Sequence, residues 1–290
     1  MKNRIDKFIL NPQSSLWKLS LPMMVGMSVQ AIYMLIDTAF IGNWIGWKAL
    51  TGLGVVFPLL FIIMGITFGL GSGSTTVIAQ SVGEKNKEKA DSFANHTIIL
   101  GIFLSIIFVI IGYFVGDKIL IAQGVKGQSL IYAKDYFYTM LIGTPFMILA
   151  IFFRSILSGE GDTVMPMKVL GLGTIINIIL DPPLIYFYAI KGAAVATVLS
   201  QFLVFIIFVY LIILKKHSFI SINLKKFKFN KIHLIQIFKV GIPAALSMLI
   251  MSIGIFIYNI ILSKTLNADS SIAAYAIAHR IEHLFFLPII

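Results

Sequence analysis

Long apolar runs, each ended by a short polar or charged stretch, dominate the chain. Residues 98–115 and 202–214 are two such runs. A helix rises about 1.5 Å per residue, so about 20 apolar residues cross the hydrocarbon layer of a bilayer. The pattern therefore predicts an all-α integral membrane protein with about eight transmembrane helices. The predicted helices cover residues 15–42, 50–81, 91–115, 134–157, 163–187, 192–214, 234–263 and 270–290.

Composition strengthens the membrane prediction. Hydrophobic residues make up 58% of the chain and charged residues 12%, with a mean hydropathy of +0.95. Soluble domains carry roughly 25% charged residues, so this chain has too little polar surface for water. The absence of cysteine excludes disulfides and thiolate metal sites. We expect no cofactor, other than Na⁺ or H⁺ as a coupling ion.

The basic residues predict the orientation. With the N-terminus in the cytoplasm, sixteen of the 23 Lys and Arg residues lie on the cytoplasmic side and six on the other, while Arg280 lies within a span. The bias follows the positive-inside rule. The net charge of +11 is spread over several loops, which argues against a nucleic-acid partner. We expect a multi-pass protein of the cell membrane.

One short motif occurs twice. The sequence WKLSLP at residues 17–22 resembles FKVGIP at residues 238–243, and the copies start six predicted spans apart. Both then run in the same direction, as in transporters built from parallel repeats. Chance similarity between apolar helices is the alternative. The repeat predicts an N-terminal six-helix lobe (1–214), a basic inter-lobe loop (215–233) and the first two helices of an incomplete second lobe (234–290).

Three acidic residues lie inside predicted spans: Asp37, Asp181 and Glu282. An ionised carboxylate at bilayer depth costs about 2.5–3.5 kcal/mol on insertion scales, so it indicates a function. Asp37 and Asp181 lie five or six residues from the outer ends of helices that run the same way. Both are therefore expected roughly 8–9 Å below the outer surface, where they can share a pocket.

Polar residues accompany each carboxylate. Gln30 and Tyr33 share a helix face with Asp37, and Thr174 and Asn177 share one with Asp181. The oxygen ligands of such residues suit Na⁺ or a shared proton.

Two prolines follow Asp181 directly. Pro182 and Pro183 deprive the carbonyls of Ile178 and Ile179 of their helical donors. We expect an opened backbone beside the carboxylate, as in transporter cation sites. A simple kink near the helix end is the alternative. Thr197, on the next predicted helix, is expected at a similar depth.

Two further clusters favour structural interpretations. His279, Arg280, Glu282 and His283 are expected to form a local polar pairing or to line a cavity, rather than to bind a metal. The small residues around Gly69, Gly71 and Gly73 are expected to allow close helix packing.

Four segments resemble the multidrug and toxic compound extrusion (MATE) transporters, and among them the DinF-like branch. They are AQSVGE at 79–84, RSILSGEGDT at 154–163, GAAVAT at 192–197 and RIE at 280–282. The resemblance runs along the whole chain. It implies two six-helix lobes around a central cavity, and export of organic cations or amphipathic drugs in exchange for Na⁺ or H⁺ by alternating access.

The resemblance also implies site residues. In DinF-like members the first lobe carries a cation site, and the matching positions are Asp37, Asn177, Asp181 and Thr197. The substrate cavity would be lined by Gln30, Tyr33 and Thr174. Members of the family have about 450 residues, so a truncated fragment that does not transport is one alternative.

Other functions fit the residues less well. A lipid-linked oligosaccharide flippase of related fold would need a longer basic cavity. An intramembrane enzyme would need a nucleophile or a metal set, which the first seven predicted helices lack. A channel would show pore-lining rings rather than a tandem repeat. We expect a monomeric transporter, not an enzyme, with drug-like small molecules and the lipid bilayer as partners.

Overall fold

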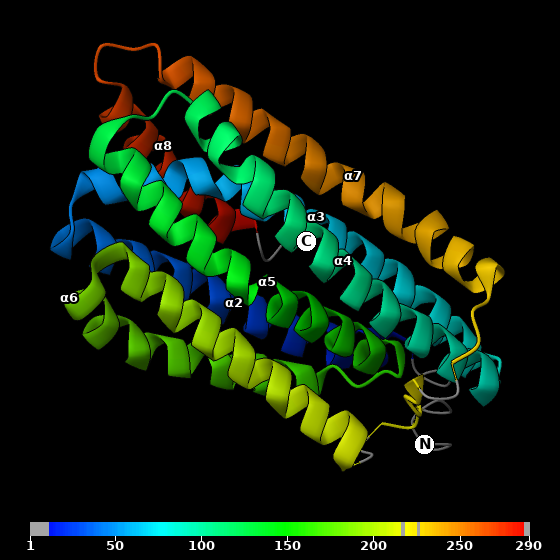
Figure 1. Ribbon diagram of the computed structural model, residues 1–290. Helices are drawn as coiled ribbons and strands as arrows, with labels where there is room; N and C mark the ends of the chain where they lie inside the picture. The colour runs from blue at the N-terminus through cyan, green and yellow to red at the C-terminus, as the bar shows by residue number, and fades with distance from the viewer. Residues whose placement is uncertain (1–11, 216–217, 225–226, 287–290) are drawn as a thin grey trace.

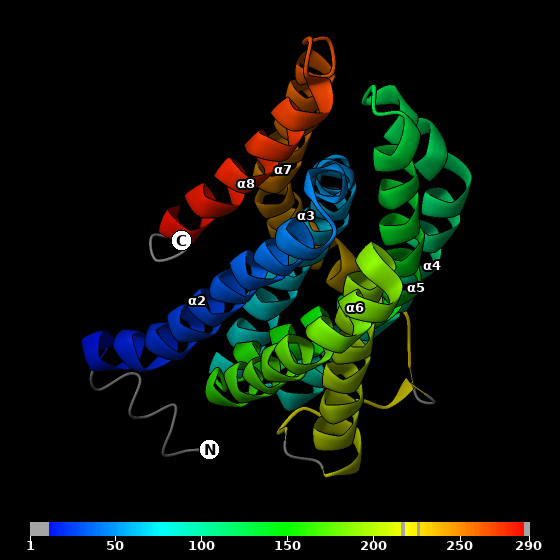
Figure 2. The ribbon, with the colours of Figure 1, turned by 90° about the vertical axis from the view of Figure 1, so that its left-hand side faces the viewer.

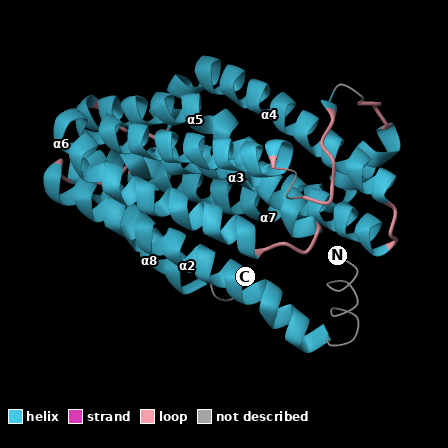
Figure 3. Cartoon of the chain, turned by 90° about the horizontal axis from the view of Figure 1, so that it is seen from below, coloured by secondary structure: helices cyan, strands magenta, loops and turns pink. Residues whose placement is uncertain are grey.

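The computed structural model describes residues 12–215, 218–224 and 227–286, and every regular element within them is helical (Figure 3). The elements are α2 (Pro12–Trp44), α3 (Trp47–Gly83), α4 (Lys87–Ala122), α5 (Gly127–Gly159), α6 (Val164–Val209), the π-helical turn η1 (Tyr210–Leu214), α7 (Lys231–Leu262) and α8 (Ala268–Phe286). Each predicted helix corresponds to one of these elements, except that residues 163–187 and 192–214 share α6 and η1.

Several of the helices are membrane-spanning in character. In the described part of the chain, α3, α4, α5, α6 with η1, and α7 are long and apolar enough to cross a bilayer. Large apolar side chains also remain on the outside of the bundle. Phe103, Ile106, Ile110 and Phe114 form one stripe on α4, and each is at least 51% exposed. In water such a stripe would be costly, whereas lipid chains solvate it.

Helix α3 lies at the centre of the bundle. It packs against α4 and α5 on one side and against α7 and α8 on the other (Figures 1 and 2). Two apolar cores line it: one contains Leu70, Phe93 and Phe152, and the other contains Leu53 and Phe137. Helix α2 packs mainly along α6, which brings the helices of Asp37 and Asp181 together.

The break in α6 lies at Ala189, where the backbone is left-handed (φ 51°, ψ −137°). Three residues later the chain passes so close to its own preceding turn that a Cβ on Gly192 would overlap the carbonyl of Leu184. The motif that begins at Gly192 therefore starts where only glycine fits. The helix continues through Pro182 and Pro183, so the expected opening beside Asp181 is not found.

An inter-lobe segment, residues 218–224 with 227–230, joins η1 to α7 at the end of the bundle predicted to be cytoplasmic. Side chains of the predicted N-terminal lobe hold it by its main-chain N–H groups. Ile220 donates to Glu160 (2.8 Å), Ser221 to Asp91 (2.8 Å), Asn223 to Asn95 (2.9 Å) and Asn230 to His96 Nε2 (2.8 Å). The segment that connects the two predicted lobes is thus fixed along α4 and the end of α5.

Candidate functional site

Two acidic side chains are buried together where α2 passes α6. Asp37 is 5% exposed and Asp181 is fully buried. They are close enough for their charges to interact. The sequence predicts that the two residues lie at a similar depth, because both are five or six residues from the outer ends of helices that run the same way.

Polar neighbours complete the pocket. The buried amide of Asn177 donates from Nδ2 to Asp181 Oδ1 over 3.3 Å, one helical turn away. Tyr33 Oη lies 3.4 Å from Thr197 Oγ1. The Thr197 hydroxyl also lies within hydrogen-bond distance of the carbonyl of Ala193 (3.0 Å). The contact between Tyr33 and Thr197 ties α2 to the second half of α6.

Thr174 and Gln30 are the other two residues predicted to line the substrate cavity. Thr174 donates to the carbonyl of Leu170 (3.1 Å) within its own helix and lies one turn below Asn177. Among the described residues it makes no hydrogen bond to either carboxylate. The side chain of Gln30 lies outside the described residues.

Each carboxylate keeps one oxygen without a partner. Asp37 Oδ1 and Asp181 Oδ2 are buried and accept no hydrogen bond from the described residues. Buried polar atoms are nearly always paired, because an unpaired one costs about 1–3 kcal/mol. Two such oxygens on neighbouring carboxylates, beside amide and hydroxyl oxygens, fit a small hard cation or a proton.

Arg280 of α8 is the site residue that the sequence interpretation placed elsewhere. It is 5% exposed, its Nη1 donates to the carbonyl of Met34 on α2 (3.3 Å), and it lies 4.4 Å from the centre of the Phe57 ring. Its charge interacts with that of Asp37. The expected local pairing forms without it, between His279 and Glu282 (3.5 Å).

The spacing along α8 explains this arrangement. Positions two residues apart face different sides of a helix, so Arg280 cannot share a face with Glu282. The two-residue spacing of Arg280 and Glu282 can be read from the sequence. The approach of α8 to α2 is a tertiary contact, which the sequence pattern does not indicate.

The small residues of α3 serve packing, as predicted. A Cβ on Gly69 would lie 2.5 Å from the backbone nitrogen of Ala245, and one on Gly71 would lie 2.7 Å from Ser155 Oγ. These positions therefore allow α7 and α5 to approach α3 closely. In the described part of the chain, no cluster of His or acidic residues is suited to a transition metal.

Known proteins with similar sequences are named as multidrug export or multidrug resistance proteins. The chain is 30% identical over 264 residues to the multidrug export protein MepA of Staphylococcus aureus, covering 90% of this chain and 58% of that protein. It is 30% identical over 284 residues to the probable multidrug resistance protein NorM of Thermotoga maritima, covering 95% and 60%. The chain thus spans less than two thirds of these relatives.

Solved structures of transporters also have a similar fold to this chain. An inward-facing conformation of a multidrug resistance MATE family transporter of the MOP superfamily superposes with a TM-score of 0.86 at 33% identity, over 95% of this chain and 63% of that one. A MOP superfamily transporter from Pyrococcus furiosus gives a TM-score of 0.88 at 33% identity, over 96% and 62%.

The family assignment rests on a direct match. The model of the MatE family matches residues 22–183, which is more than half of the chain and includes Asp37, Asn177 and Asp181. Assignment to the DinF-like branch stays a prediction. The chain belongs to the MatE family, and is therefore a multi-pass membrane protein of a transporter family rather than an enzyme.

Proposed function

We propose that this chain provides the cation-coupling lobe of a multidrug efflux antiporter, which exports organic cations or amphipathic compounds in exchange for Na⁺ or H⁺. The observation that carries the proposal is the buried pair Asp37 and Asp181, each with an unpaired oxygen. The names of its relatives support multidrug export. Because the chain spans about 60% of their length, the proposal concerns the protein at full family length.

The chemistry of exchange follows from charge. Two neighbouring buried carboxylates are costly while both are ionised and unpaired. A Na⁺ ion held by Asp37, Asp181 and Asn177, or a proton shared by the carboxylates, lowers that cost. The two carboxyl groups then titrate as a coupled pair. An organic cation that approaches the same negative pocket competes with the coupling ion.

Binding changes the balance between conformations only through differential affinity. The hydroxyl contact between Tyr33 and Thr197 joins α2 to the second half of α6. A cation that draws Asp37 toward Asp181 therefore favours the form in which α2 lies along α6. A form that releases α2 separates the two carboxylates and releases the cation.

The test is drug efflux from proteoliposomes that contain the protein at full family length. Asp37→Asn and Asp181→Asn should each abolish efflux driven by a Na⁺ or pH gradient, while thermal stability is retained. The gradient that drives the wild-type protein identifies the coupling ion. Asp135→Asn is the matched control, because Asp135 is an exposed acid on α5 away from the pocket. Coupled efflux that survives in both site variants would rule out the proposal.

A further inference from the structure

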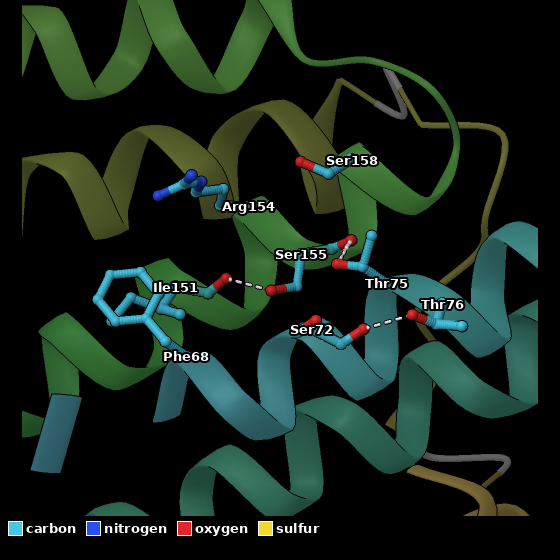
Figure 4. A pocket seen from close by; sticks show the side chains of 8 residues that line it. All are labelled: Phe68, Ser72, Thr75, Thr76, Ile151, Arg154, Ser155 and Ser158. Carbon is cyan, nitrogen blue, oxygen red and sulfur yellow. Dashed lines mark hydrogen bonds between the residues drawn. The ribbon is translucent and has the colours of Figure 1, made fainter. Parts of the chain in front are cut away.

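A second polar pocket lies between α3 and α5, near the end of the lobe predicted to be cytoplasmic (Figure 4). Its volume is about 220 Å³, smaller than the roughly 300–1,000 Å³ of pockets for drug-sized ligands. It therefore suits a charged head group rather than a whole drug molecule. Its walls are formed by Phe68, Ser72, Thr75, Thr76, Ile151, Arg154, Ser155 and Ser158.

Arg154 carries the only charge in the lining of this pocket. Its side chain is half-buried, and its guanidinium group lies over the ring of Phe68 at 5.9 Å. Within the described chain it makes no ion pair and no hydrogen bond. An arginine stays charged and offers five N–H donors in a planar fork, so these donors remain available to a ligand.

The hydroxyl groups of the pocket divide into two kinds. Three of them already donate to backbone carbonyls: Thr75 to Ser155 (3.0 Å), Thr76 to Ser72 (2.9 Å) and Ser155 to Ile151 (2.9 Å). Figure 4 draws these bonds as dashed lines beside the side chains of Arg154 and Ser158.

Ser72 and Ser158 are the other two. Their hydroxyls donate to no group among the described residues. The donors left over in the pocket are therefore one guanidinium and two hydroxyls, and no carboxylate faces them. A cation finds repulsion there, whereas an oxyanion finds a bidentate partner and up to two further donors.

The pocket is separate from the acidic pair. Asp181 lies 17 residues from the start of α6 at Val164, and Arg154 lies five residues from the end of α5 at Gly159. Both of those helix ends lie at the predicted cytoplasmic side, so the two sites differ in depth by roughly 18 Å at a rise of about 1.5 Å per residue. A single small drug does not reach both, and the basic site needs a ligand of its own.

We propose that this pocket binds the oxyanion of an amphipathic anion, a carboxylate or a phosphate, with Arg154 as the counter-ion and Ser72 and Ser158 as further donors. The ring of Phe68 and the branched side chain of Ile151 receive the first part of the apolar tail. The inference does not depend on the cation site. The same chemistry is offered by a soluble amphipathic anion and by the phosphate of a lipid head group.

Binding of decyl phosphate to the 290-residue chain in dodecyl maltoside tests the pocket, read by thermophoresis. Decyltrimethylammonium and decyl maltoside have the same tail and carry a positive charge or none. The wild-type chain should prefer decyl phosphate to both. Arg154→Gln should weaken its binding by about tenfold or more, because a charge-assisted bidentate contact is lost.

Three further variants keep the test decisive. Lys168→Gln removes an exposed positive charge near the same end of the lobe and should bind like the wild type. Arg154→Lys keeps the charge without the fork and should bind with intermediate affinity, which excludes misfolding as the cause of the loss. Ser158→Ala should weaken binding several-fold. Equal binding by Arg154→Gln and the wild type, or equal binding of the cationic and anionic probes, would overturn the proposal.

Competition by phosphatidylglycerol identifies the source of the anion. Displacement of decyl phosphate from the wild type by this lipid would assign the pocket to a lipid head group. Retention of decyl phosphate would assign it to a soluble anion.

Discussion

Glu160, the first residue after α5, uses both carboxylate oxygens to hold the inter-lobe segment. Ser218 and the N–H of Ile220 donate to Oε1, and the N–H of Phe219 donates to Oε2 over 3.2 Å. Burial raises the pKa of Glu160 above its ordinary value, and these three donors only partly oppose the rise. The native protein therefore binds a proton at Glu160 more tightly than the unfolded chain does.

This difference predicts a pH dependence with a definite sign. A raised pKa means that the stabilising contribution is fully present below the ordinary pKa of glutamic acid, and is lost as the pH rises through the raised value. Protection of the amides of residues 219–221 against hydrogen exchange, corrected for the intrinsic effect of pH, should fall as the pH rises.

Two variants separate the proton from the contacts. Glu160→Gln keeps an acceptor for Ile220 but cannot titrate, so its protection should no longer vary with pH. Glu160→Ala should lose the protection at every pH. An identical pH profile in the wild type and in Glu160→Gln would show that another group is responsible.

At the scale of the elements, α3 and α7 approach until their backbones touch. A Cβ on Gly73 would lie 2.9 Å from the backbone nitrogen of Gly241 and would overlap the carbonyl of Ile237. Buried polar bonds join the same two helices. Ser252 donates to the carbonyl of Pro58 (2.6 Å), and Asn259 donates to that of Gly54 (3.0 Å).

Gly73→Ala should therefore destabilise the protein by about 1–3 kcal/mol, the usual cost of overpacking. The obstacle is backbone, which cannot rotate away as a side chain can. Gly254→Ala on α7 is the control, because a Cβ there meets nothing within 4 Å. It should be neutral or stabilise by up to about 1 kcal/mol through helix propensity. Thermal unfolding in detergent measures both, and equal melting temperatures would contradict the packing argument.

Much of this arrangement was predictable from sequence, because a bilayer sets helix length and depth by hydrophobicity alone. Hydrophobicity indicated the helices, and depth paired Asp37 with Asp181. The predicted boundary between the spans 163–187 and 192–214 contains Ala189, where α6 breaks, whereas the helix continues through Pro182 and Pro183, where an opened backbone was expected. Loss of a donor weakens a helix locally, but the close return of the chain at Gly192 decides where it turns. That return is a tertiary contact, which periodicity does not reveal.

At the scale of the whole molecule, Arg280 connects helices from the two ends of the chain. It reaches from α8 to the carbonyl of Met34 on α2, and its charge interacts with Asp37. A cation that binds at Asp37 meets this fixed positive charge. Under the proposed function, cation binding at Asp37 and the approach of α8 to α2 should oppose each other.

Arg280→Met should raise the affinity of the site for Na⁺, because the competing charge is gone. An increase within the roughly 5–150-fold range of ordinary coupling free energies is expected. Arg280→Lys should stay near the wild type. Thermal stabilisation by Na⁺ measures the affinity, with Lys264→Met, an exposed charge in the turn between α7 and α8, as the control. An unchanged or lower affinity in Arg280→Met would disprove the competition.

The inter-lobe segment is held by donors that every amino acid except proline possesses. Its side chains add contacts of their own: Ile220 is buried in the apolar core, and Ser221 Oγ accepts a hydrogen bond from Lys87 Nζ (3.1 Å). The main-chain hydrogen bonds that hold the segment depend on the acceptors Asp91, Asn95, His96 and Glu160. Among natural variants of this protein we expect these four acceptors to persist, and we expect proline to be missing at positions 220, 221, 223 and 230.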